Sequence, residues 1–436
     1  MSVSKTFKDE NVYWRDTSGR APTSSLVNEG FACDVAIVGG GFTGLRAAIE
    51  LAEAGVDVAV YEGGELGEGA SGRSGGQVNP MLTIGKPVDV MRAIGRGYFE
   101  RLAETALNSA DELFGTLKKY DIKCHQRQKG WVRANHSAVA GKEARLNAKA
   151  WNRFGAGLEV LGSGADVAEM TGAQGYHSAV HCLSGGAIHP LRLVYGLADV
   201  AMAKGAKIFT KAKVSSLESR NDQSTLTVNG HKIRAKFVVL ATNAYADNLL
   251  TGLKRSFLPL TPIQMATGKL TEQQIKGILP RNHTISDTRR LIMYARREPN
   301  NRIVFGGMGY RTPWGTVGGF QWMQQDVARI FPSLKLANWQ FKWGGRIAVT
   351  DDRLPHLHEA GNGVIAGLGY NGRGVAMSMV MGRVLAQRVL GAKPLDLPFP
   401  ITMVKPITFQ RTQMLGSAVA MGWMPFKDMQ EMKKGA

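Results

Sequence analysis

The pattern of apolar and polar positions between residues 33 and 62 changes its period twice. Residues 33–38 form a short apolar run, residues 42–53 carry apolar side chains at helical spacing, and residues 56–61 form a second apolar run before Glu62. This order predicts a strand, a helix and a second strand. The chain therefore contains a βαβ unit, the building block of α/β folds.

The same two periods predict further elements along the chain. Helices are predicted over 88–120, from Pro190 to near Gly205, near 321–331 and over 375–390. Strand patterns occupy residues 130–134, 176–189, 207–214, 225–229, 232–235, 237–241, 291–295, 302–306 and a run from Gly363. Because 436 residues are too many for one compact core, we expect two domains.

The turn between the first strand and the helix reads Gly39-x-Gly41-x-x-Gly44. Gly39 permits a tight reversal, Gly41 lets the backbone approach a pyrophosphate, and Gly44 lets the helix lie close to the strand. Glu62 follows 21 residues after Gly41, where its carboxylate can accept hydrogen bonds from ribose hydroxyls. A lone glycine motif is weak evidence, but this context predicts an adenine dinucleotide site.

Two later glycine-rich segments extend this hypothesis. The loop 67–77 follows Glu62 directly, and its Ser71 and Arg73 offer donors to phosphate oxygens. The turn 369–374 precedes a helix that begins near Val375, so the positive end of that helix faces whatever occupies the turn. An ordinary turn before a helix would have the same spacing.

The net charge of +19 is high, with basic residues gathered in 118–153 and 289–297. Contact with nucleic acid, an anionic membrane or an acidic substrate would use such charge, but the absence of five consecutive like charges favours a solvated basic surface. No transmembrane helix or signal peptide is predicted. Three separated cysteines fit a reducing compartment, so we expect a cytoplasmic protein, with peripheral membrane attachment as the alternative.

Several motifs together resemble the D-amino-acid oxidase-like FAD-dependent oxidoreductases, and most closely the gamma-glutamylputrescine oxidase-like branch. They are the Gly39–Glu62 unit, the loop Gly69-Ala-Ser-Gly-Arg-Ser-Gly-Gly-Gln77, Gly186-Ala-Ile-His189-Pro190, Ala241-Thr-Asn-Ala244, Trp343-Gly-Gly-Arg346, Thr350-Asp-Asp352-Arg-Leu-Pro355 and Gly369-Tyr-Asn-Gly-Arg-Gly374. The resemblance spans residues 10 to 425. It implies a Rossmann-like FAD-binding domain of glutathione-reductase type, with an inserted substrate domain of mixed β-sheet and helices.

The resemblance also implies a division of the chain. An N-terminal arm would comprise residues 1–30, the FAD-binding domain residues 31–85, 155–250 and 345–395, and the substrate domain residues 86–154, 251–344 and 396–436. In the last segment, an apolar helical stripe is predicted to pack onto the substrate domain, or alternatively to dock on a membrane surface. The stripe comprises Phe409, Met414, Leu415, Trp423 and Met424.

The cofactor implied by the resemblance is FAD. The expected cofactor-binding residues are Gly39, Gly41, Phe42, Thr43, Gly44, Glu62, Gly63, Ala70, Ser71, Arg73, Ser74, Gly75, Gly76, Gln77, Val214, Ala241, Thr242, Asn243, Gly344, Arg346, Gly369, Asn371, Gly372, Arg373, Gly374 and Val375. FAD is expected to be non-covalent, because Cys33, Cys124 and Cys182 do not match the flavin-linked cysteine of sarcosine-oxidase relatives. No metal is expected.

The implied reaction moves hydride from the carbon beside an amine to flavin N5, after which the imine hydrolyses. The partners would be a small amine or amino acid, and oxygen or a quinone as electron acceptor. The lysines that hold a substrate carboxylate and assist oxygen in relatives have no counterpart, because Val375, Ala376 and Met308 stand there. Arg346, Tyr310 and Trp343 are weak catalytic candidates.

Other functions remain open at this stage. An RNA-binding or tRNA-modifying flavoprotein would suit the basic surface, although no nucleic-acid partner is expected. A quinone-linked amino-acid dehydrogenase would differ in its electron acceptor only. A disulfide-reductase-like flavoenzyme lacks its second glycine motif and cysteine pair here, and a non-catalytic FAD-binding module is the last alternative.

Overall fold

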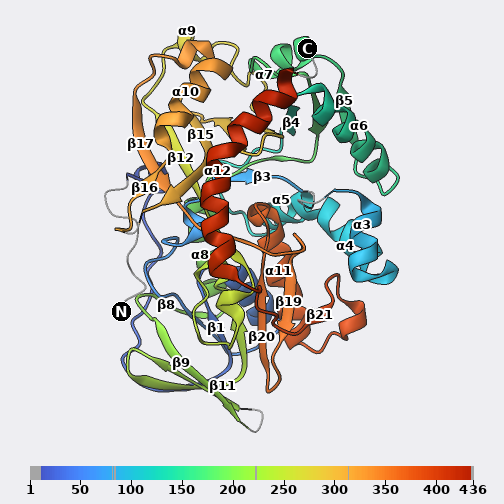
Figure 1. Ribbon diagram of the computed structural model, residues 1–436. Coiled ribbons are helices and arrows are strands. Elements are labelled where there is room, and N and C mark those ends of the chain that lie inside the picture. Colours follow the sequence, from blue (N-terminus) through green and yellow to red (C-terminus); the bar gives the residue numbers. More distant parts are fainter. Residues whose placement is uncertain (1–10, 81, 83–84, 221–222, 313, 434–436) are drawn as a thin grey trace.

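The computed structural model describes residues 11–80, 82, 85–220, 223–312 and 314–433, and residues 1–10 of the predicted arm lie outside this range. Two large β-sheets lie toward opposite ends of the molecule, with helices around them (Figure 1). A short pair of strands, β3 (Gln77–Val78) and β7 (Gly186–Ala187), forms a third sheet. The predicted α/β class is confirmed.

The first sheet, within the described residues, has nine strands in the order β21-β19-β20-β11-β1-β2-β8, with β10 and β9 continuing from β11. Its bounds are β1 (Ala32–Val38), β2 (Val58–Tyr61), β8 (Lys207–Phe209), β9 (Val214–Arg220), β10 (Gln223–Val228), β11 (His231–Leu240), β19 (His356–Glu359), β20 (Val364–Leu368) and β21 (Ile401–Thr402). Strand β1 pairs in parallel with both β2 and β11, so the carboxyl ends of these strands meet at one edge.

The second sheet has ten strands in the described residues, in the order β17-β12-β15-β14-β13-β4-β6-β5, with β16 on β15 and β18 on β12. Its bounds are β4 (Trp131–Asn135), β5 (Leu158–Leu161), β6 (Ser178–Cys182), β12 (Leu258–Thr267), β13 (Thr284–Asp287), β14 (Met293–Arg297), β15 (Ile303–Arg311), β16 (Val317–Gly318), β17 (Trp339–Gly344) and β18 (Ile347–Val349). We call this sheet the roof, because its inner face covers the cavity described below.

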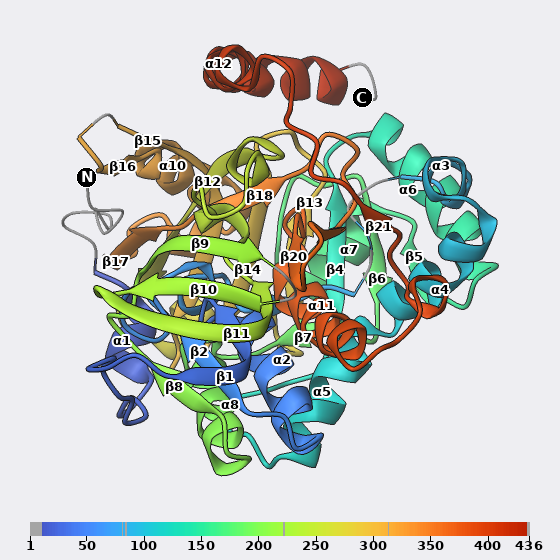
Figure 2. The ribbon, with the colours of Figure 1, turned by 90° about the horizontal axis from the view of Figure 1, so that it is seen from below.

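Helices surround both sheets (Figure 2). They are α1 (Tyr13–Thr17), α2 (Phe42–Glu53), α3 (Pro87–Ile94), α4 (Arg96–Leu107), α5 (Ser109–Lys119), α6 (Ala138–Asn152), α7 (Gly164–Thr171), α8 (Pro190–Ala203), α9 (Glu272–Ile275), α10 (Phe320–Ile330), α11 (Gly374–Val389) and α12 (Gln410–Lys433). Helices α2, α8 and α11 share one core with a face of the first sheet, and α10 buries its apolar side chains against the outer face of the roof.

Sequence-based boundaries differ from the structure where the chain bends around the cavity. The strand predicted over 207–214 is broken, because β8 ends at Phe209 and Lys211 has a positive φ of 51°. The backbone N–H of Ala212 then donates to the Glu62 carbonyl at 2.8 Å. The predicted pieces 232–235 and 237–241 are instead one strand, β11.

Strand partners also differ from the expected division of the chain. Strands β5 and β6 fall in the segment 155–250 expected for the FAD-binding domain, yet they belong to the roof through antiparallel pairing of β6 with β4. Strand β21 falls in a segment expected for the substrate domain, yet it pairs with β19 of the first sheet. The period of apolar positions predicts that a segment is a strand, but it does not identify the strand with which that segment pairs.

The N-terminal arm contains the short helix α1, which inserts its aromatic side chains into the core. Tyr13 and Trp14 are buried, and Trp14 Nε1 donates to the Ser74 carbonyl at 2.9 Å. The Trp14 ring also lies edge-on to the ring of Trp343 at 5.9 Å. The arm therefore supports the glycine-rich loop 67–77.

The expected packing of the C-terminal stripe is wrong. Helix α12 forms a layer outside the body of the molecule (Figure 2), and the side chains of Phe409, Met414 and Trp423 are exposed. Met424 is half-buried, and the side chain of Leu415 lies outside the described part of the structure. Polar contacts hold α12 instead: Asp428 Oδ1 accepts from Arg290 Nη1 at 2.6 Å. Among the described residues, no helix is long and apolar enough to cross a membrane.

A titration prediction arises at the start of α8. His189 is the buried N-cap of this helix, and its Nδ1 accepts from the backbone N–H of Arg192 at 3.2 Å. Burial, aided by the charge of Arg296, lowers the pKa of His189 to about 3. Below about pH 6.5, His189 is protonated in the unfolded chain but stays neutral in the folded chain. The folded state therefore loses stability as the pH falls from about 6.5 toward 3.

We expect His189→Asn to reduce this acid sensitivity. Asn keeps a capping oxygen and cannot titrate. Urea denaturation measures the free energy of unfolding of both proteins between about pH 6.5 and 5. As the pH falls, this free energy should decrease less steeply in the variant than in the wild type, and the two slopes should differ by up to about 1.4 kcal/mol per pH unit. Parallel pH profiles for the two proteins would contradict this prediction.

Candidate active site

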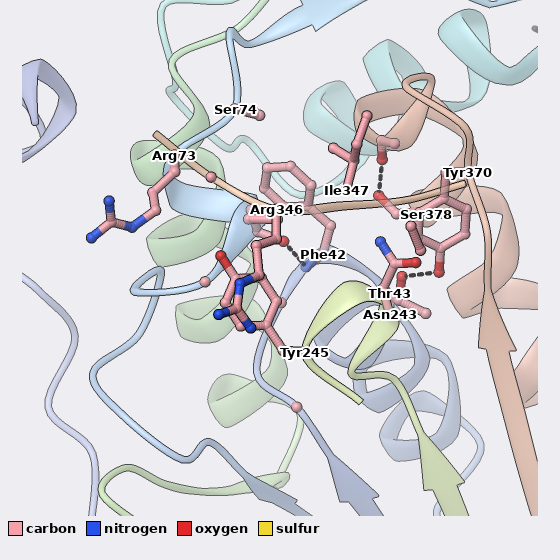
Figure 3. A pocket seen from close by; sticks show the side chains of 18 of the residues that line it. Phe42, Thr43, Arg73, Ser74, Asn243, Tyr245, Arg346, Ile347, Tyr370 and Ser378 are labelled. Carbon is pink, nitrogen blue, oxygen red and sulfur yellow. Dashed lines mark hydrogen bonds between the residues drawn. The ribbon is translucent and has the colours of Figure 1, made fainter. Parts of the chain in front are cut away.

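A cavity of about 470 Å³ receives residues from both sheets. One side is lined by the turn after β1, the loop 67–77 and residues 212–214, and the other by side chains of the roof. Its size is typical of a small-molecule or cofactor site. Figure 3 shows the region where the start of α2, Arg346 and the turn before α11 converge.

The turn after β1 has the close packing that its glycines predict. Gly39 has a φ of 110°, and a Cβ on Gly44 would lie 2.0 Å from the Gly39 carbonyl oxygen. A Cβ on Gly41 would lie 2.8 Å from Ser71 Oγ, the same oxygen that accepts from the backbone N–H of Phe42 at 3.0 Å (Figure 3). The start of α2 therefore lies close to the loop 67–77 at the cavity, where a pyrophosphate would be bound.

Glu62 lies at the cavity with its carboxylate held by backbone donors. Its Oε2 accepts from the N–H of Gly40 at 2.9 Å, and its Oε1 accepts from the N–H of Gly64 at 3.1 Å. Burial raises the pKa of Glu62, and these backbone hydrogen bonds oppose the shift. The remaining lone pairs can accept from ribose hydroxyls, so the donor set fits an adenine dinucleotide.

Arg73 lines the cavity, but its guanidinium is engaged by the protein. Nε donates to the Glu68 carbonyl at 2.8 Å and Nη1 to the Gly344 carbonyl at 3.1 Å. The Arg73 carbonyl in turn accepts from Trp343 Nε1 at 2.9 Å and from Gln264 Nε2 at 2.7 Å. The predicted contact with a phosphate stays a prediction, and in the structure these hydrogen bonds fix the loop between the two sheets.

Arg296 on β14 holds the next part of the same loop, and sequence reasoning did not find this role. Its Nη1 donates to the carbonyls of Gly75 and Gly76 at 3.0 Å and of Ile188 at 2.6 Å. Gly76 has a φ of 62°, and a Cβ there would lie 2.3 Å from the Ile188 carbonyl oxygen. Only glycine allows this approach.

The second glycine turn is tied to α2 and to the end of β11. The hydroxyls of Tyr370 and Thr43 are 2.6 Å apart (Figure 3), and the N–H of Gly369 donates to Asn243 Oδ1 at 3.0 Å. Asn371 has a φ of 51°, and its Oδ1 accepts from the N–H of Thr350 at 2.9 Å. These contacts direct the start of α11 at the cavity.

Most of the residues expected to bind the cofactor line the cavity; Gly44, Gly344 and Gly369 do not. Among the weak catalytic candidates, Arg346 lines it, with its guanidinium 5.7 Å from the centre of the Tyr245 ring. Trp343 is buried behind the loop and Tyr310 is 53% exposed elsewhere. Lining residues that sequence reasoning missed include Asn79, Arg133, Tyr245, Gln264, Ser286 and Tyr294. No signal marked them, because they lie on ordinary strands and loops.

Residues 34–388 match the model of the DAO family, described as FAD dependent oxidoreductase. The chain belongs to this family and is an FAD-dependent oxidoreductase.

Particular relatives agree with this assignment. The chain is 30% identical to gamma-glutamylputrescine oxidoreductase of Escherichia coli strain K12 over 394 residues, which cover 87% of this chain and 88% of that protein. The crystal structure of glycine oxidase from Geobacillus kaustophilus is similar with a TM-score of 0.72 and 22% identity, covering 85% of this chain and 98% of that one. L-proline dehydrogenase from P. horikoshii has a TM-score of 0.69 and 21% identity, with coverages of 84% and 96%.

Proposed function

We propose that the protein oxidises a carbon–nitrogen single bond of a small amine or amino acid, with FAD bound non-covalently in the cavity. The observation that carries this proposal is one continuous cavity, lined on one side by the dinucleotide cradle and on the other by polar side chains of the roof. Family membership supplies the redox cofactor, and the 30%-identical relative named for an amine substrate supports the substrate class.

The polar side chains form a row across neighbouring strands of the roof. Ser286 of β13 is paired with Tyr294 of β14, Tyr294 with Gly306 of β15, and Gly306 with Gln264 of β12. Paired residues share one face of a sheet, so the row faces the cavity together. A Cβ on Gly306 would lie 2.0 Å from the Tyr294 ring, so this glycine makes room for the tyrosine.

Two members of this row suit an amine. Gln264 Oε1 is a buried acceptor without a partner among the described residues, and it can accept from an N–H group. Burial raises the pKa of Tyr294, which keeps its hydroxyl protonated as a donor. We propose that these groups orient the substrate, while Arg73, Arg296 and Trp343 keep the loop 67–77 in place.

For the cofactor, we propose that Gly39, Gly41 and Glu62 bind the adenosine and pyrophosphate, and that Val214 meets the adenine through its backbone. Bound FAD supplies a hydride acceptor at N5, so the amine becomes an imine that water hydrolyses. Residues 371–375 would lie beside the flavin ring, where the start of α11 favours negative charge. Oxygen or a quinone would be the electron acceptor.

The test is anaerobic mixing of the holoenzyme with a panel of acylated diamines, polyamines, and D- and N-methyl amino acids. We expect one class to bleach the oxidised flavin, and air or a quinone then to restore its colour, which also identifies the acceptor. NADPH serves as the comparison reductant. If every amine leaves the flavin oxidised, the proposed function is wrong.

A further inference from the structure

Two arginines from different elements line the cavity. Arg133 lies on β4 in register with Ser286, so its side chain continues the row of polar groups on the inner face of the roof. Arg373 is the N-cap of α11, and its guanidinium carbon lies 4.4 Å from the centre of the Trp131 ring. Trp131 precedes Arg133 by two residues on the same face of β4. We call Arg133 and Arg373 the arginine pair.

Neither member of the arginine pair has an acidic partner among the residues that the structure describes. No salt bridge in the described part of the chain includes Arg133 or Arg373. Asp287 attracts Arg133 from a distance, but as the neighbour of Ser286 it points to the opposite face of the sheet, where it pairs with Arg289. Arg373 Nη1 donates to Oδ1 of Asn79 at 3.1 Å when that amide is oriented for the contact, and this partner is neutral.

Two half-buried like charges without a counter-ion are unfavourable. Burial and the nearby charge of Arg133 lower the pKa of Arg373 to about 9, and burial lowers the pKa of Arg133 as well. Buried charges in proteins are normally paired. The positive end of α11, a helix of 16 residues, adds to the same potential. This end of the cavity therefore favours an anion.

We propose that the arginine pair is a subsite for a carboxylate at the end of the substrate remote from the oxidised amine. Guanidinium groups match carboxylate oxygens through paired N–H donors. The substrate class is then an amine that carries a carboxylate beyond a spacer, such as an N-acylated diamine. A free diamine would bring a second ammonium against two cations. The identity of the reacting amine rests on the proposed function, whereas the carboxylate site rests on the arginine pair alone.

Ligand binding tests the subsite without turnover. The holoenzyme is titrated with 4-acetamidobutyrate and with its neutral primary amide, following calorimetric heat and the flavin spectrum. We expect the carboxylate to bind, and Arg133→Met or Arg373→Met to raise its Kd by about 10- to 100-fold with little effect on the amide. Arg92→Met, at an exposed position on α3, is the matched control. Arg133→Lys or Arg373→Lys should keep more of the affinity for the carboxylate than the corresponding Met variant.

Thermal unfolding separates a ligand-binding role from a structural one. Removing a half-buried charge that has no counter-ion should leave the Tm of either Met variant unchanged or raise it. A lower Tm together with unchanged carboxylate binding would assign the arginine pair to folding and overturn the inference. Weaker FAD binding with unchanged carboxylate binding would assign the arginine pair to cofactor binding, which would also overturn the inference.

Substrate preference provides a second test of the carboxylate subsite. N-succinylputrescine should reduce the flavin faster than N-acetylputrescine or putrescine, and both Met variants should lose this preference. Equal reduction by the charged and neutral substrates in the wild type would overturn the inference. If no amine reduces the flavin but carboxylate binding still depends on the arginine pair, the subsite stands and the proposed function fails.

Discussion

Gly44→Ala should release FAD and destabilise the protein. A Cβ at this position would lie 2.0 Å from the Gly39 carbonyl oxygen and 3.1 Å from Ile37 Cγ2. The first contact is with backbone that forms the tight turn, so α2 must move away from β1. We expect a loss of about 1–3 kcal/mol in the free energy of unfolding and at least a 10-fold rise in the Kd for FAD. The measurements are flavin content after gel filtration and titration of the apoprotein with FAD.

Gly115→Ala is the matched control for Gly44→Ala. Gly115 lies inside α5, and nothing lies within 4 Å of a Cβ built there. Alanine in a helix interior is favoured over glycine by about 1 kcal/mol, so this variant should be slightly stabilised and keep its FAD. If Gly44→Ala binds FAD as tightly as Gly115→Ala, the dinucleotide does not lie at the start of α2.

Arg289→Ala should cost about 3–5 kcal/mol of stability. Its Nη1 and Nη2 each donate to an oxygen of Asp326 at 2.7 Å, and its Nε pairs with Asp287, which is buried. Tyr176 adds a hydrogen bond to Asp287 Oδ2 at 3.1 Å. Removing the arginine leaves Asp287 without a counter-ion and leaves Asp326 with Arg329 alone, in a part of the roof that does not line the cavity. Equilibrium urea unfolding measures the loss.

Acid should partly rescue Arg289→Ala. Burial raises the pKa of the Asp287 carboxyl and Arg289 opposes this shift, so without the arginine the folded variant binds more protons than the unfolded chain and gains relative stability as the pH falls toward about 4. The difference from the wild type should therefore shrink between about pH 7 and 5. Arg92→Ala, which breaks an exposed pair with Asp89, should cost less than about 1 kcal/mol. A difference that does not change with pH would contradict the assigned network.

The local sequence pattern was enough to predict the dinucleotide-binding half of the site. Strand β1, helix α2 and strand β2 lie where periodicity predicted them, because each is a short element whose apolar face and glycine turn are encoded within about 30 contiguous residues. The roof side could not be predicted in the same way. The same cavity is lined by Arg133, Tyr294 and Gln264 only because their strands β4, β14 and β12 belong to one sheet.

Two features make contacts that their sequence pattern did not predict. The apolar stripe of α12 predicted burial, yet the helix is held by Arg290 and its partners, because ion pairs that cross from another element leave no periodic signal. Arg73 was predicted from its loop to bind phosphate, which stays a prediction, and in the structure it donates to the carbonyls of Glu68 and Gly344. A guanidinium offers the same fork to either acceptor, and only the fold determines which one is near.

The sequence alone therefore determined the class of fold and the kind of cofactor, because glycine spacing and apolar period are local constraints on the backbone. The tertiary structure decided which side chains from distant strands line the same cavity, and which of their charges lack a partner. Those properties depend on strand order and register, which no single segment of this chain encodes.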